Sequence, residues 1–64
     1  MSKSTFIPFC IEHYAEHIKQ PGYKVYKLFK KEKLLDMLKE DYEDLHGMGI
    51  EYLINMFDDY LKES

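Results

Sequence analysis

Sixty-four residues with a single cysteine make one domain without an internal disulfide, and a chain this small is marginally stable unless a metal or another chain helps. The net charge of −3 is unevenly spread: residues 19–35 carry six lysines against one glutamate, and residues 36–64 carry nine acidic side chains against two lysines. All nine basic residues are lysine, which lacks the guanidinium fork for phosphate or guanine, and no apolar run approaches the ~20 residues that span a bilayer. We therefore expect a cytoplasmic protein that binds neither nucleic acid nor membrane.

Capping residues and helix-breaking proline and glycine predict four helices, over about residues 5–19, 23–31, 33–46 and 50–62. Ser4 or Thr5 can cap the first helix, and Pro8 is tolerated there because the amides of the first turn lack partners within the helix and no hydrogen bond is lost. Residues 20–22 (QPG) end the first helix, and Gly47 is expected as a left-handed cap after the third. No segment alternates with period two, so residues 1–64 are expected to form one all-α, four-helix domain.

Each predicted helix has an apolar side that we assign to the core. The first three of these sides contain Ile7, Cys10, Ile11, Tyr14, Ala15 and Ile18, then Val25, Tyr26, Leu28 and Phe29, then Leu34, Leu35, Leu38, Tyr42 and Leu45.

The last helix carries two adjacent apolar stripes. The first contains Ile50, Leu53, Ile54, Phe57 and Leu61, and the second contains Tyr52, Met56 and Tyr60. Together they cover roughly 200° of the helix, where an ordinary surface helix needs a little over 100°. Tyrosine and methionine are also favoured at interfaces. We therefore expect the second stripe to face another protein, with Phe6, Phe9 and His13 of the first helix contributing to the contact.

Three other patterns contain residue types that occur in catalytic, metal or nucleic-acid sites. Serine and threonine occur only at Ser2, Ser4, Thr5 and Ser64, near the ends of the sequence, which argues against a hydroxyl nucleophile held in a triad. Cys10, His13 and His17 share a helical face, but one helix seldom supplies a complete metal site, so we expect no metal, no cofactor and no catalytic residue. The lysines of residues 23–31 are expected to form a solvated face or a binding surface for an acidic partner. A nucleic-acid site is disfavoured because the chain lacks arginine and its net charge is negative.

Four ordered segments resemble a family of small bacterial domains of unknown function. They are residues 9–15 (FCIEHYA), 25–31 (VYKLFKK), 42–46 (YEDLH) and 51–54 (EYLI). The resemblance spans about Phe6 to Tyr60, although the turn at residues 20–23 is less polar and the lysines are denser than is typical of the family. Members are often encoded beside an ADP-ribosyltransferase-like protein, in an arrangement that resembles a toxin–antitoxin pair.

The resemblance implies an antitoxin-like protein that is not an enzyme and that neutralises a cognate protein toxin by direct contact. The apolar stripes independently indicate protein binding. Two alternatives remain open from the residues alone: a self-associating, homo-oligomeric regulatory domain, or a phage-type inhibitor of a host protein.

Overall fold

The computed structural model describes residues 2–62, so Ser64, one of the four hydroxyl residues considered above, lies outside the described residues. Within this range the chain is all-α, as the sequence predicts. Its elements are α1 (Lys3–Ile18), α2 (Gly22–Lys31), α3 (Leu34–Glu40), the short α4 (Tyr42–Leu45) and α5 (Ile50–Lys62). None of these helices combines the length and the apolar character needed to cross a bilayer.

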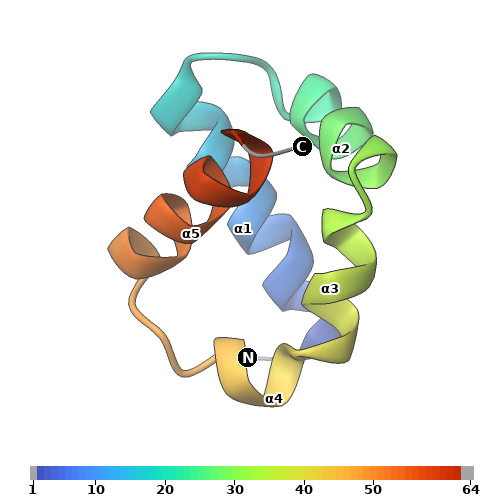
Figure 1. Cartoon of the computed structure of the whole chain (residues 1–64), viewed down its shortest axis with the longest axis vertical. Helices are drawn as coiled ribbons and strands as arrows, with labels where there is room; N and C mark the ends of the chain where they lie inside the picture. Colours follow the sequence, from blue (N-terminus) through green and yellow to red (C-terminus); the bar gives the residue numbers. More distant parts are fainter. Residues whose placement is uncertain (1, 63–64) are drawn as a thin grey trace.

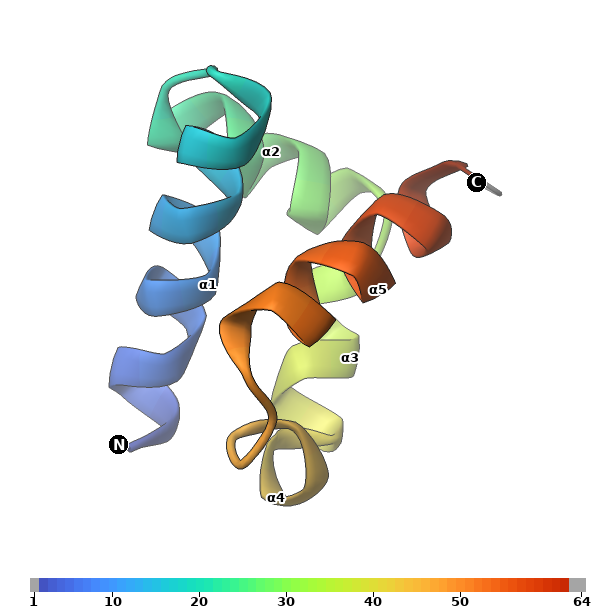
Figure 2. The same cartoon turned by 90° about the vertical axis from the view of Figure 1, so that its left-hand side faces the viewer.

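The helices are arranged around α1. In Figure 1, α5 crosses in front of α1, while α2 and α3 follow one another down the side and α4 turns beneath them. Figure 2, turned by 90°, shows α5 running obliquely between α1 and the α2–α3 arm. Helix α5 packs chiefly on α1, which also contacts α2 and α3. Residues far apart in the sequence therefore meet along the α1–α5 contact.

One hydrophobic core holds these helices together. Its buried members are Phe6, Cys10, Ile11, Tyr14, Ala15, Val25, Phe29, Leu34, Leu35, Leu38, Leu45, Leu53 and Phe57. Three aromatic rings meet at its centre: Phe29 lies 5.3 Å from Phe57 and 5.6 Å from Tyr14, centroid to centroid, and Tyr14 meets Phe57 edge-on at 5.8 Å. Edge-to-face aromatic packing of this kind stabilises beyond the area that the rings bury.

The first helix begins two residues earlier than predicted. The N–H of Phe6 donates to the carbonyl of Ser2, which occupies the cap position without a side-chain hydrogen bond to the backbone. Pro8 consequently lies in the second turn rather than the first. Its missing N–H removes a hydrogen bond to the Ser4 carbonyl, so the expectation that Pro8 costs no hydrogen bond is wrong.

The predicted third helix is divided at Asp41. The N–H of Asp41 donates to the Met37 carbonyl over 2.8 Å, and the Asp41 carbonyl accepts from the N–H of Leu45 over 2.9 Å. Asp41 (φ −99°, ψ 17°) therefore ends α3 and caps α4. Beyond the break, the Tyr42 ring meets Phe6 edge-on at 5.4 Å.

Two lysines, rather than a glycine, adopt the left-handed conformation. Lys19 (φ 57°) ends α1 and Lys33 (φ 62°) precedes α3, whereas no glycine within residues 2–62 has a positive φ. The left-handed cap predicted at Gly47 is therefore wrong. A non-glycine residue in this conformation costs about 1–2 kcal/mol. At Lys19 the positive charge beside the carboxyl end of α1 offsets part of that cost.

Candidate functional site

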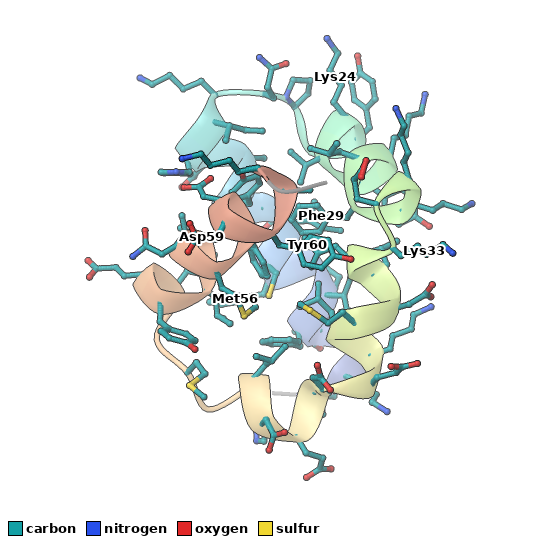
Figure 3. All side chains as sticks on the ribbon, in the orientation of Figure 1. Lys24, Phe29, Lys33, Met56, Asp59 and Tyr60 are labelled. Carbon is teal, nitrogen blue, oxygen red and sulfur yellow. The ribbon has the colours of Figure 1, made fainter. Side chains whose placement is uncertain are left out.

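The second apolar stripe of α5 is divided between surface and interior. Tyr52 is 56% exposed, whereas Met56 and Tyr60 are partly buried and pack against the core. In Figure 3, Tyr60 reaches from α5 toward the junction of α2 and α3. There its hydroxyl donates to the backbone carbonyl of Glu32 over 2.8 Å. Tyr60 thus connects α5 to the carboxyl end of α2. Part of the second apolar stripe therefore packs within the domain and is not available to a partner.

Helix α5 is held along two flanks. At 100° per residue, Asp58 and Tyr60 lie roughly 160° apart around the helix. Asp58 contacts α1 and Tyr60 contacts the α2–α3 junction, so Tyr52 faces outward between them. Met48, immediately before the helix, is 43% exposed. We call Met48, Tyr52 and Met56 the Tyr52 patch.

The three predicted contact residues of α1 do not form a second surface of this kind. Phe6 is 1% exposed and belongs to the core, so its assignment to a partner surface is corrected. Phe6 lies one turn before the buried Cys10, and this spacing places it on the same buried side of α1. Phe9 and His13 are partly buried and pack ring to ring at 4.4 Å.

The structure reveals a polar cluster between α1 and α5 that the sequence patterns did not indicate. The hydroxyl of Tyr14 donates to Oδ1 of Asp58 over 2.6 Å, and Nε2 of His17 lies 2.9 Å from Oδ2 of the same carboxylate. These residues are 44 and 41 positions apart in the chain. Helical periodicity places Tyr14 in the core and His17 on the same face as Cys10, and it indicates no partner for Asp58. Only the α1–α5 contact brings them together.

The pKa shifts in this cluster indicate a structural role. We call Tyr14, His17 and Asp58 the clasp between α1 and α5. The hydrogen bond from Tyr14 is the main cause that lowers the pKa of Asp58; burial opposes it, and His17 lowers it further. Burial, followed by the hydrogen bond to Asp58 and its negative charge, raises the pKa of Tyr14 well above its usual range. The phenol therefore stays protonated and the carboxylate ionised near neutral pH. A protonated phenol and a stabilised carboxylate make a poor nucleophile and a poor base.

Cys10 does not combine with the histidines into a site. It is 0% exposed, and burial raises the pKa of its thiol to about 12. His13 contacts Phe9 and His17 contacts Asp58. Among residues 2–62 no cluster of three or more metal-ligating side chains occurs.

This burial predicts an inert thiol. In the native protein Cys10 should react with an aromatic disulfide reagent far more slowly than a free thiol, because the reactive thiolate is scarce and covered. The rate should rise to that of a small-molecule thiol when a denaturant unfolds the chain. Absorbance after reagent addition measures both rates. Fast stoichiometric labelling under native conditions would mean that α1 opens readily.

A hollow of about 460 Å³ lies on the α2–α3 side of the molecule. It is lined by Tyr26, Lys30, Lys33, Leu35, Asp36 and Lys39. Tyr26 is 47% exposed, which corrects its assignment to the core. It lies one residue beyond Val25, and the buried side of α2 is narrow, with only Val25 and Phe29 fully covered. We call these six residues the basic hollow.

Comparison with known proteins identifies a family but no characterised relative. The family described as "Protein of unknown function (DUF3791)" matches residues 5–64. No curated protein matches the chain. No solved structure matches it either. Because the matched range covers almost the whole sequence, including all four segments that carried the resemblance, this chain belongs to the DUF3791 family of proteins of unknown function.

Proposed function

We propose that this protein is antitoxin-like: it binds a cognate protein toxin directly through the Tyr52 patch and neutralises it. The observation that carries the proposal is Tyr52, an aromatic side chain 56% exposed on a helix that is already held along two flanks. Tyrosine is among the residues that contribute most to binding when a partner covers it. Met56, one turn along α5, and Met48, an exposed residue of the turn before the helix, supply adaptable apolar surface.

The identity of the partner rests on the resemblance given above. Domains with these ordered segments are often encoded beside ADP-ribosyltransferase-like proteins, and we propose such a protein as the toxin. The polar cluster of Tyr14, His17 and Asp58 leaves a protonated phenol and an ionised carboxylate, which suits a structural contact between α1 and α5.

Co-expression with the neighbouring gene's product tests the proposal. The wild-type protein should co-purify with that product and relieve its toxicity. Tyr52→Ala should weaken binding by about 2 kcal/mol, roughly 30-fold in Kd, while its helical circular dichroism stays unchanged. Calorimetry measures the affinity and colony growth measures the rescue.

Tyr23 offers a matched control, since it is a tyrosine 62% exposed on α2, away from the Tyr52 patch. Tyr23→Ala should bind and rescue like the wild type. If the wild-type protein neither co-purifies with its neighbour nor protects against it, the antitoxin proposal is wrong. If it does both, and Tyr52→Ala behaves like Tyr23→Ala, the function stands and the assigned surface is wrong.

A further inference from the structure

We propose that the basic hollow binds the acidic segment of residues 40–44 from a second copy of this chain. The inference is independent of the Tyr52 patch. It rests on two sets of opposite charges within one molecule, the lysines of the hollow and the carboxylates of residues 40–44, which do not pair with each other.

The hollow presents concentrated positive charge around an apolar floor. Lys30 comes from the last turn of α2, Lys33 from the left-handed junction and Lys39 from the last turn of α3. In Figure 3, Lys33 points outward, away from α5. Tyr26 and the buried Leu35 complete the lining, and Asp36 is its one carboxylate. Within residues 2–62 the sole ion pair joins His17 to Asp58, so none of these lysines is neutralised by a carboxylate within 4.0 Å.

The acidic segment is the complement of that surface. Residues 40–44 read EDYED, and all four of their carboxylates are exposed. The segment spans the end of α3 and the start of α4, at the lower end of the molecule in Figure 1. Tyr42, at its centre, is partly buried between Phe6 and His46. The backbone that carries the carboxylates is therefore anchored to the core rather than free to fold back onto the lysines.

Charge complementarity favours a second copy as the occupant. Residues 19–35, which supply Lys30 and Lys33, have a surplus of positive charge, and residues 36–64, which supply Lys39 and the acidic segment, have a surplus of negative charge. Pairing between copies brings the opposite charges together, steers the encounter and fixes its register. A polyanion such as DNA would meet the same hollow but would be repelled by the neighbouring carboxylates, and lysine lacks the bidentate geometry for phosphate.

The test is sedimentation velocity of the purified protein at about 10 mM and about 200 mM salt, where the Debye length falls from ~30 Å to below 10 Å. Wild-type protein should associate at low salt, and the association constant should fall at least about tenfold at the higher salt. Lys30→Glu/Lys39→Glu and Glu40→Lys/Glu43→Lys should each remain monomeric. These four side chains are exposed, and the left-handed Lys33 is left untouched, so circular dichroism should stay native.

Mixing the two charge-reversed proteins in equal amounts is the decisive step. Each reversed surface then faces a complementary one, so the mixture should associate although neither component does alone. Lys24→Glu/Lys27→Glu, which reverses two lysines of α2 outside the hollow, should associate like the wild type, as should Tyr52→Ala. The second of these controls separates this contact from the proposed toxin contact.

Four results would overturn the inference. Wild-type protein could remain monomeric at low salt and high concentration. The reversed variants could associate as strongly as the wild type, which would place the contact elsewhere. The mixture could fail to associate, or a DNA duplex could bind the hollow in competition with self-association at about 150 mM salt, which would assign the lysines to nucleic acid.

Discussion

Replacing Phe57 with alanine is expected to unfold the domain. Phe57 is 0% exposed and its ring packs against Tyr14 and Phe29 at the centre of the core. Truncating a buried phenylalanine costs about 3–5 kcal/mol through lost transfer energy and the cavity that remains. A domain of this length has a total stability of about 3–10 kcal/mol, so little or none would be left. Loss of the helical circular dichroism signal, or a midpoint of urea unfolding near zero, measures the effect.

Tyr23→Ala is the matched control for this substitution, because it also truncates an aromatic side chain on a helix but at a position that is 62% exposed, so it removes far less buried surface. Its Tm should stay within a few degrees of the wild type. A Phe57→Ala protein that melts cooperatively near the wild-type temperature would show that α5 is not part of the cooperative core.

Replacing Asp58 with alanine is expected to loosen the α1–α5 contact. The substitution leaves the hydroxyl of Tyr14, a residue 4% exposed, without its acceptor. An unsatisfied buried donor costs about 1–3 kcal/mol, and because the side chain of Asp58 is 42% exposed, water can approach and bring the cost toward the lower end. Asp59→Ala, a substitution of the exposed neighbouring residue, should leave the free energy of unfolding almost unchanged. Urea unfolding of both variants gives the difference, and equal midpoints would contradict a role for the clasp.

The same clasp predicts how the stability of the wild-type protein depends on pH. The pKa of Asp58 is lowered in the folded state, so its contribution is present above the ordinary aspartate pKa of about 3.9 and is lost as the pH falls below it. The pKa of Tyr14 is raised, so its contribution is present below the ordinary tyrosine pKa of about 10 and is lost as the pH rises beyond it. Asp58→Ala should remove the change at low pH and only reduce the change at high pH, because burial, the main cause of the raised pKa of Tyr14, remains.

Helical periodicity predicts most of this fold. The spacing of Cys10, Ile11, Tyr14 and Ala15 identifies the buried side of α1, and Leu53 with Phe57 identifies that of α5. Periodicity does not locate the break at Asp41, because Leu38 and Leu45 lie one heptad apart and keep the same phase on either side of it. The preference of glycine for left-handed caps also misplaces the left-handed residues, since it favours Gly47 over Lys19 and Lys33 and does not weigh the favourable charge of Lys19 at the carboxyl end of α1.

The surface is less predictable than the core. A helical wheel assigns Tyr52, Met56 and Tyr60 to one stripe, yet only the tertiary arrangement decides that Tyr60 reaches the Glu32 carbonyl while Tyr52 stays exposed. Tyr14 and Asp58 illustrate the same limit, because pairs 44 positions apart leave no local pattern. An aspartate within a mostly apolar stretch of α5, beside Phe57, is a weak signal that a partner for it exists elsewhere.

The packing of α5 on α1 also has a consequence for synthesis. Helix α1 leaves the ribosome first, but the surface that covers it comes from residues 50–62. Until those residues emerge, the apolar side of α1 can be only partly covered by α2 and α3. Domains generally fold as units during synthesis, and this domain can complete its core only when α5 is available to cover α1. A nascent chain stalled before residue 50 would therefore expose apolar surface to chaperones and proteases, so incomplete copies would be removed before they could compete with the finished protein.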